Sequence, residues 1–350
     1  MDIKTQQLLE ALATTHALGQ DDYAYLIDHQ DDESSAFAAQ LAVDTRQRIY
    51  GNQVFIRGLI EVSNYCKNDC LYCGIRASNR QIARYRLSPE AILDCCKQGY
   101  QLGFRTFVLQ GGEDPAFTDE MLVPLISAMK QQHPDCAITL SLGERPRESY
   151  QALFDAGADR YLLRHETATA DHYAQLHPSR MDFDQRMTCL RDLKSIGFAT
   201  GCGFMVEPPF QTTEHLAADL AFIQEFQPDM CGIGPFVPHH ATPFAHHPTG
   251  SAKLTCFLLS LIRLIKPNIL LPATTALGTA EAGGRERGIL AGANVVMPNL
   301  SPADHRADYA LYDNKLSSGG EAAEGLRMLR ESMQGIGYEL VVDRGDVASE

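Results

Sequence analysis

Residues 54–73 read VFIRGLIEVSNYCKNDCLYC, an apolar run followed at once by a compact set of cysteines. The run 54–63 is rich in β-branched and other apolar residues and predicts a strand. Cys66, Cys70 and Cys73 follow it with the spacing Cys-x3-Cys-x2-Cys. A loop this short can turn three sulfur atoms toward one centre, so the stretch predicts a metal site at the end of a strand.

The number of cysteines in this loop indicates which kind of metal site it forms. A structural zinc site takes four protein ligands, and an electron-transfer 4Fe-4S cluster usually takes four cysteines. The loop offers no fourth cysteine and no suitable histidine, and the next thiols, Cys95 and Cys96, fall inside a predicted helix. Three ligands on a four-iron cluster leave one iron open for chemistry, as on a catalytic zinc ion. The spacing therefore favours a catalytic cluster over a partial zinc site or three unrelated buried thiols.

Short β-rich runs alternate with longer helical patterns along most of the chain. The strand candidates are 54–63, 106–110, 137–142, 160–165, 199–206, 229–235, 269–274 and 294–298. The helical patterns between them lie near 89–102, 119–132, 147–156, 184–196, 213–226, 251–265 and 282–291. Such alternation predicts an α/β fold with a parallel sheet, and eight units predict a closed (β/α)8 barrel of the TIM type.

The segments outside the barrel are predicted to be extensions of it. Residues 1–50 are interpreted as an N-terminal helical extension, 51–312 as the barrel, and 313–350 as a short C-terminal extension that packs on the barrel. Within the last segment, 322–333 has a helical pattern and 338–342 is a short apolar run. No linker or low-complexity stretch divides the chain.

The composition indicates which classes of partner the protein is not expected to bind. The formal net charge is −14, and an acidic surface repels nucleic-acid backbones and anionic lipid. The N-terminus lacks the apolar region of a signal peptide, and the most apolar stretch, 256–265, is too short to cross a bilayer. We therefore expect a cytoplasmic protein with neither nucleic-acid nor membrane partners. In a reducing compartment the ten cysteines are thiols or metal ligands, and the seven outside the loop are interpreted as small core residues.

Active sites of this barrel class lie at the carboxyl ends of the strands. The second strand leads into Gly111-Gly112-Glu113, where two glycines let the backbone approach a ligand closely. The fourth leads into Arg164-His165-Glu166, in which the two charged residues share one face by strand alternation and the histidine points the other way. These charges form either a structural ion pair or a grip on a ligand, and the histidine is equally compatible with packing.

The predicted strands also carry polar residues on faces that alternation assigns to the barrel interior. These residues are Arg57 and Glu61, Thr106 and Gln110, and Arg160 together with Arg164 and Glu166. Buried arginine requires an anionic partner, so the interior is predicted to hold a polar cavity for a small, partly anionic substrate.

The cysteine spacing, with Tyr72 just before the third cysteine, resembles the signature of the radical S-adenosylmethionine (SAM) superfamily. The resemblance implies one 4Fe-4S cluster on Cys66, Cys70 and Cys73, with SAM bound to the open iron through its amino and carboxylate groups. Reductive cleavage of SAM would then give a 5′-deoxyadenosyl radical that acts on the substrate. In this superfamily a Gly-Gly-Glu motif after the second strand contacts the SAM amino group.

Longer stretches resemble the HydE family of FeFe-hydrogenase maturases, in the biotin synthase-like group, from the first helices to about residue 312. They include 84–86, 110–115, 141–144, 159–167, 232–236, 272–276, 283–286 and 296–299. The predicted cofactor-binding residues are Tyr72, Gly111, Gly112, Glu113, Ser141, Glu166, Arg186 and Met230. The predicted cavity residues are Arg57, Gln110, Thr274, Thr275 and Tyr309, to which strand alternation adds Arg160.

This resemblance also implies a substrate and partners. The substrate would be a small anionic iron–carbonyl–cyanide complex carrying cysteine, used in assembly of the hydrogenase H-cluster. The partners would be the maturases HydG and HydF and a reduced electron donor such as a ferredoxin or flavodoxin.

Two departures and three alternatives remain. Residues 313–325 contain no thiol, although some relatives carry a second cluster near this position, so one cluster is predicted. Glu207-Pro208-Pro209-Phe210 stands where relatives often have Gly-Leu-Pro-Gly. The alternative enzymes are a methylornithine synthase-like lysine mutase and a biotin synthase-like enzyme, although biotin synthase needs a second cluster. The non-enzyme alternative is an iron–sulfur scaffold or carrier.

Overall fold

The computed structural model describes residues 1–316 and 322–349. Residues 317–321, which belong to the predicted C-terminal extension and to the thiol-free stretch 313–325, lie outside the described residues, as does residue 350. Among the described residues, no helix has the length and apolar character needed to cross a membrane.

Parallel strands form the inner layer of the molecule. Six of them make one sheet in the order β2-β3-β4-β5-β6-β8. Their bounds are β2 Gly58–Ser63, β3 Thr106–Gly111, β4 Ala137–Ser141, β5 Arg160–Leu162, β6 Ala199–Cys202 and β8 Met230–Cys231. Isolated parallel bridges from Met230 to Leu270 and from Pro272 to Val295 continue the ring beyond β8. The predicted α/β barrel of the TIM type is confirmed, although its seventh strand is present only as these bridges.

The first predicted strand is interrupted at Arg57 and belongs to two sheets. Its first part, β1 (Gln53–Ile56), lies between β10 (Val295–Val296) and β11 (Glu339–Val341) in a three-stranded parallel sheet. A bridge between Leu59 and Asn299 links its second part to the end of the ring. The pair β7 (Met205–Val206) and β9 (Gly234–Pro235) forms a separate small sheet, because the fifth and sixth predicted strands break after Cys202 and Cys231.

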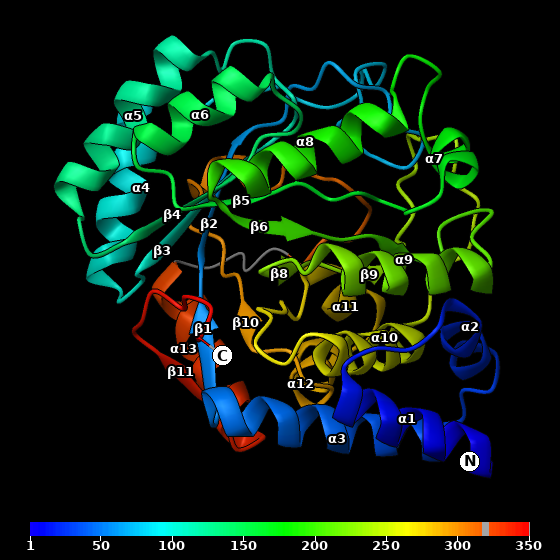
Figure 1. The fold of residues 1–350 in the computed structure, drawn as a ribbon. Coiled ribbons are helices and arrows are strands. Elements are labelled where there is room, and N and C mark those ends of the chain that lie inside the picture. Colours follow the sequence, from blue (N-terminus) through cyan, green and yellow to red (C-terminus); the bar gives the residue numbers. More distant parts are fainter. Residues whose placement is uncertain (317–321, 350) are drawn as a thin grey trace.

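Helices cover the outside of the barrel (Figure 1). Ser88 caps the first covering helix through its hydroxyl, with Pro89 in the first turn, which is the arrangement that favours helix initiation. The covering helices are α4 Pro89–Gln101, α5 Asp119–Gln132, α6 Arg147–Asp155, α7 Ala170–Leu176, α8 Phe183–Ile196, α9 Thr213–Phe226, α10 Ala252–Ile265, α11 Thr275–Ala280 and α12 Gly284–Leu290. A 3-10 turn, η1, spans Ala303–His305.

The two extensions pack on the barrel from different directions. The N-terminal helices α1 (Ile3–Thr15), α2 (Gln20–Asp28) and α3 (Asp32–Tyr50) lie against α9 and α10 (Figure 1). At the other end of the chain, α13 (Ala322–Gly335) leads into β11, which pairs with β1. The short apolar run near the C-terminus is therefore a strand that widens the sheet.

The residues after β11 cross the barrel at the end where the parallel strands begin. Arg160, the first residue of β5 and almost fully buried, donates to the carbonyl oxygens of Arg344 (2.8 Å) and Gly345 (3.1 Å), to Asp346 Oδ1 (2.6 Å) and to Thr106 Oγ1 (3.1 Å). The tail thus supplies three of the acceptors that this buried guanidinium needs.

This arrangement separates three predicted site residues from the cysteine loop, which follows the opposite end of β2. Arg160 is bound by the tail, and Arg57 donates to Met230 Sδ at 2.9 Å. Met230 itself packs with Tyr50, Phe55, Leu270 and Val295. Strand alternation predicted which side chains face the barrel interior, but not how far along the barrel axis each of them lies. The structure therefore does not bring Arg57, Arg160 or Met230 to the end of the barrel that carries the cysteines.

Ending the chain after Asp343 is expected to lower the free energy of unfolding by about 3 kcal/mol, because a buried charge that loses its partners is strongly destabilising. Urea unfolding monitored by circular dichroism measures the change. The control Asp346→Asn keeps both carbonyl acceptors and removes a half-exposed carboxylate, so it should cost about 1 kcal/mol or less. Equal stability of the truncated and full-length chains would contradict this role of the tail.

Candidate active site

The cysteine loop is fixed to the barrel by backbone hydrogen bonds. The amide of Leu71 donates to Leu176 O at 3.0 Å, at the end of α7, and the amide of Gly74 donates to Leu311 O at 2.8 Å. In Figure 1 the loop lies at the upper right beside α7. Arg84 closes it by donating to the carbonyl oxygens of Asn64, Ile75, Arg76 and Asn79. The loop is therefore held in shape by its own backbone and one guanidinium.

The three loop cysteines are free thiols that are partly exposed. Burial, followed by the neighbouring Cys66 sulfur, raises the pKa of the Cys73 thiol to about 12. Burial and the other two sulfurs likewise raise the pKa of Cys70. Three neighbouring thiols resist losing their protons because the resulting thiolates would repel one another. A cation between them removes this repulsion and stabilises the thiolates. The set fits an iron–sulfur cluster, since soft thiolates without a histidine or carboxylate are the ligands such clusters use.

The Gly-Gly-Glu motif ends β3 directly against this loop. A Cβ atom on Gly112 would lie 2.2 Å from Tyr65 O and 2.8 Å from Cys66 Cβ, so only glycine fits there. The Glu113 carboxylate accepts the amide of Glu144 at 3.1 Å and pairs with Lys67 at 3.2 Å. The motif therefore places a carboxylate next to the cysteine loop.

A second charged group stands at the end of β5. Arg186, on α8, donates to Glu144 and to Arg164 O, and Arg164 pairs with Glu166 at 3.3 Å. Glu166 has φ +67°, a left-handed conformation that is costly for a residue with a side chain. Apart from this ion pair, the Oε2 atom of Glu166 has no hydrogen-bond partner among the described residues, nor has the buried Nε atom of Arg164. Strain and unpaired polar atoms at one place are the features expected of a ligand-binding position.

A buried hydrogen-bonded pair, His165 and Asp219, lies next to Glu166 and holds the backbone there. His165 Nδ1 accepts the amide of Gly203 at 3.2 Å, so its Nε2–H donates to Asp219, also at 3.2 Å. Asp219 further accepts the amide of Ala168 at 2.6 Å. The sequence left open whether His165 packs in the core or contacts a ligand. The structure places it among packed residues, facing away from the charged group.

Tyr72 belongs to an aromatic wall beside the cysteines. Its hydroxyl donates to His177 Nε2 at 3.1 Å, while His177 Nδ1 donates to Tyr173 O at 2.9 Å. Burial lowers the pKa of His177 to about 4, so its imidazole is neutral near pH 7. Sequence reasoning missed His177, because a lone histidine in a short helix carries no pattern that marks it.

An inner polar group lies deeper in the barrel. Gln110 donates to the Tyr309 hydroxyl at 3.4 Å, and the fully buried Glu61 accepts from Asn299 at 2.8 Å and from Lys315. Lys315 also donates to Tyr309 O at 2.8 Å. Lys315 was assigned only to the C-terminal extension, and nothing in the sequence marked it as an interior residue.

The other predicted residues at this end of the barrel occupy strand and helix ends. Ser141 ends β4 in register with Gln110. Thr274 caps α11 by accepting the amide of Leu277 at 3.4 Å, and Thr275 is the first residue of that helix. The structure thus places these residues at the same end of the barrel as the Gly-Gly-Glu motif.

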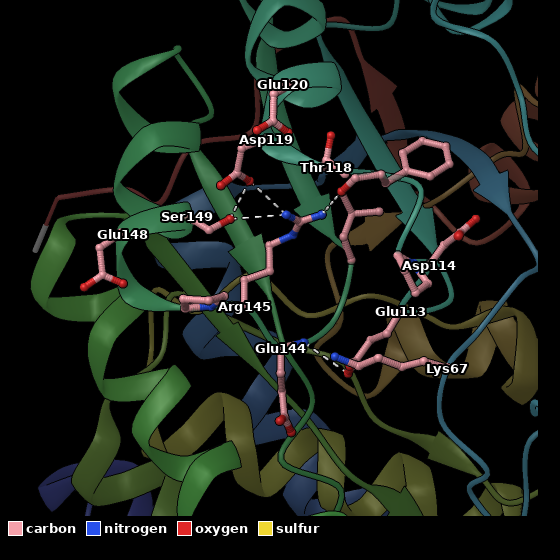
Figure 2. Close-up of a pocket in the computed structure, with 14 residues that line it drawn as sticks. Lys67, Glu113, Asp114, Thr118, Asp119, Glu120, Glu144, Arg145, Glu148 and Ser149 are labelled. Atoms are coloured by element: carbon pink, nitrogen blue, oxygen red, sulfur yellow. Dashed lines mark hydrogen bonds and ion pairs between the residues drawn. The ribbon is translucent and has the colours of Figure 1, made fainter.

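A pocket of about 450 Å³ adjoins Glu113 (Figure 2). Arg145 bonds to Asp119 and Ser149 inside it, while Glu120 and Glu148 stand apart from that network. Six carboxylates and two cationic side chains line the pocket: Glu113, Asp114, Asp119, Glu120, Glu144 and Glu148, with Lys67 and Arg145. Such a lining favours cationic groups.

The loop 207–210, in which the sequence departs from relatives, has left-handed backbone conformations of the kind that glycine adopts readily. Glu207 has φ +56° and Phe210 has φ +69°, so both residues that replace glycines adopt left-handed conformations. The Glu207 carboxylate accepts the amide of Ser251 at 2.6 Å, next to the start of α10. The departure therefore puts side chains at two positions of left-handed backbone in this loop.

A closed α/β barrel with three cysteines in one short loop and a Gly-Gly-Glu turn beside that loop defines a class of enzyme. The sequence profile of the radical SAM superfamily matches residues 60–223, and the chain belongs to that superfamily, in the HydE family. A [FeFe] hydrogenase maturase subunit HydE from Thermotoga maritima is 45% identical to it over 79% of each chain. Membership implies a 4Fe-4S cluster and SAM as cofactors, and the protein is a radical SAM enzyme.

Three further similarities concern the superfamily and its fold. A 3-methylornithine synthase from Methanosarcina acetivorans is 28% identical over 92% of this chain and 90% of its own. The crystal structure of methylornithine synthase (PylB) has a TM-score of 0.83 and 25% identity, covering 95% of this chain and 97% of that one. The structure of HydG, a maturase of the [FeFe]-hydrogenase, shares the fold with a TM-score of 0.79 at 20% identity, over 96% of this chain and 75% of that one.

Proposed function

We propose that this enzyme acts in the assembly of the FeFe-hydrogenase H-cluster, as the HydE relative does. The observation that carries the proposal is the 45% identity to that relative over most of both chains. The 3-methylornithine synthase relative is more distant in sequence, at 28% identity, although the methylornithine synthase structure has the same fold.

Cys66, Cys70 and Cys73 would hold the cluster and leave one iron open to SAM. When bound and reduced, the cluster supplies the electron that cleaves SAM to methionine and a 5′-deoxyadenosyl radical. Gly111 and Gly112 let the backbone approach the cofactor, and the Glu113 carboxylate accepts the SAM ammonium. The acidic pocket beside Glu113 favours approach of SAM, which carries a net positive charge (Figure 2).

Glu166, Arg186 and Ser141 would orient the rest of SAM. The Oε2 of Glu166, which is ion-paired with Arg164 but accepts no hydrogen bond from the described residues, would accept from the ribose hydroxyls, and the Arg186 guanidinium would face the SAM carboxylate. The hydrogen bond from Tyr72 to neutral His177 holds the aromatic wall in place beside the cysteines. These residues bind and orient SAM and keep water away from the reacting bond.

The inner group of Gln110, Tyr309, Glu61 and Lys315, with Thr274 and Thr275 near it, would hold the substrate. Lys315 is ion-paired with the buried Glu61, so this group offers hydrogen-bond donors, from Lys315, Gln110 and Tyr309, to the anionic iron–carbonyl–cyanide–cysteine complex proposed as substrate. HydG and HydF are the proposed partners before and after this step.

Glu166→Gln is expected to weaken SAM binding about 10- to 100-fold, because a hydrogen bond to a charged acceptor contributes about 1.5–3 kcal/mol. Equilibrium binding of SAM to the cluster-loaded protein measures the change, and the cluster content should stay at the wild-type level. Glu225→Gln, at an exposed position on α9 outside this pocket, is the control and should bind SAM as the wild type does. Unchanged SAM affinity in Glu166→Gln would remove Glu166 from the SAM site.

In vitro maturation tests the assembly role. Apo-FeFe-hydrogenase is incubated anaerobically with HydF, HydG, SAM and reductant, with or without this protein. Hydrogen evolution that requires this protein supports the proposal. No activation, together with conversion of lysine to methylornithine, would replace it by the lysine-mutase assignment.

A further inference from the structure

The segment that carries the cysteine loop has a charge opposite to that of the whole chain. Residues 64–86 contain five cationic side chains (Lys67, Arg76, Arg80, Arg84 and Arg86) and one carboxylate, Asp69. This segment therefore has a formal charge of +4, whereas the chain as a whole has −14. The chain as a whole is acidic, so a positive charge confined to this one segment needs an explanation of its own.

Among the described residues, three of these five cations pair with carboxylates, and two do not. Lys67 pairs with Glu113, Arg76 with Asp69 and Arg86 with Asp114. Arg84 donates to carbonyl oxygens alone, and in 1–316 and 322–349 no ion pair is recorded for Arg80, Arg84 or Arg180. A network of backbone carbonyls satisfies hydrogen bonds but leaves the positive charge in place.

These cations form one surface around the loop. Arg180 donates to Lys67 O at 2.6 Å, which joins the segment after α7 to the cysteine loop. Burial lowers the pKa of the Arg84 guanidinium, and Arg80 lies close enough to add a small further lowering. We call the set Lys67, Arg80, Arg84, Arg86 and Arg180 the cationic face. Lys67, Arg80, Arg86 and Arg180 are exposed, and the three cysteines within the loop are themselves partly exposed.

The cationic face does more than offset the charge of the thiolates. Arg84 is enclosed by the loop and is placed to balance the charge of the cysteines. Arg80 and Arg180, in contrast, extend the positive charge outward over exposed surface. On the far side of Lys67 the surface turns acidic in the pocket of Figure 2. A positive face bounded by negative charge selects and orients a partner of negative charge.

We propose that the cationic face is the docking surface for an acidic one-electron carrier protein. The proposal rests on the proposed function, because a cluster on the three cysteines must be reduced once for each SAM cleaved. One electron passes from the reduced carrier to the cluster; the carrier is oxidised by one electron, and no atom or proton is transferred. Docking at this face places the carrier over the part of the loop where the cysteines approach the surface.

Charge reversal tests the docking surface. The double variant Arg80→Glu/Arg180→Glu is compared with wild type and with Arg327→Glu/Arg330→Glu, which makes the same charge change at exposed positions on α13. The probe is a reduced acidic bacterial ferredoxin. The first readout is its binding constant to the cluster-loaded protein over a salt series, and the second is the rate of cluster reduction by ferredoxin compared with dithionite.

The cationic-face variant should bind ferredoxin at least about 10-fold more weakly at low salt, lose most of the salt dependence, and be reduced by dithionite at the wild-type rate. The α13 variant should bind as the wild type does. Equal weakening in both double variants, or wild-type binding by the cationic-face variant, would overturn the proposal. Absence of SAM cleavage by the dithionite-reduced wild type would instead count against the proposed function, and the ferredoxin binding data would still decide the docking surface.

Discussion

Cys70→Ser is expected to lose the 4Fe-4S cluster and to cleave SAM at least about 1000-fold more slowly, a loss of about 4 kcal/mol of transition-state stabilisation. A serine hydroxyl is a poor substitute for a soft thiolate at iron, and the loop offers no other sulfur, since its cysteines are Cys66, Cys70 and Cys73. Iron and sulfide content after anaerobic reconstitution measures the first effect. Formation of 5′-deoxyadenosine under dithionite measures the second.

A matched variant separates loss of the ligand from loss of a thiol. Cys256, on α10, is also partly exposed but lies outside the cysteine loop. Cys256→Ser should keep the wild-type iron content and the wild-type rate of SAM cleavage. A Cys70→Ser protein that retained four irons and normal SAM cleavage would remove this cysteine from the cluster.

Gly112→Ala is expected to weaken SAM binding and to slow SAM cleavage at least about 100-fold, the loss of rate that a displacement of about 1 Å at a reacting centre causes. The added Cβ would meet Tyr65 O at 2.2 Å and Cys66 Cβ at 2.8 Å. Because the first of these contacts is to backbone and the second to a Cβ atom, no change of rotamer relieves them. The motif must move away from the cysteine loop, and with it Glu113. Titration of SAM into the cluster-loaded variant measures the loss.

The same substitution at a glycine with free space provides the control. A Cβ on Gly335, at the end of α13, would meet no atom within 4 Å. Gly335→Ala should therefore bind SAM normally and change stability by no more than about 1 kcal/mol. Wild-type SAM affinity in Gly112→Ala would show that the close approach of the motif to the loop has no part in binding SAM.

Local patterns in the sequence were sufficient to predict the barrel. The alternation of strands and helices depends on residues that are neighbours in the chain, and so does the spacing of the three cysteines. Closure of the ring was predicted too, but the predicted strand 269–274 is present only as isolated bridges at Leu270 and Pro272. The strand β11 was also missed, since it forms only by pairing with β1 from the other end of the chain.

The heights of side chains within the barrel could not be predicted in the same way. Alternation places Arg57, Arg160 and Glu166 on inward faces, but only the register between strands decides which end of the barrel each one faces. Arg160 begins β5 and meets the tail, whereas Glu166 follows the end of that strand. Lys315 enters the interior from a distant segment, and that contact leaves no trace in the local sequence.

The most direct test of the account is the electron paramagnetic resonance spectrum of the reduced, reconstituted protein before and after addition of SAM, with 5′-deoxyadenosine quantified in the same sample. The account predicts a 4Fe-4S signal that changes when SAM binds the open iron, followed by formation of 5′-deoxyadenosine. A cluster signal that SAM leaves unchanged, with SAM recovered intact, would contradict it and would identify the protein as a cluster-bearing scaffold.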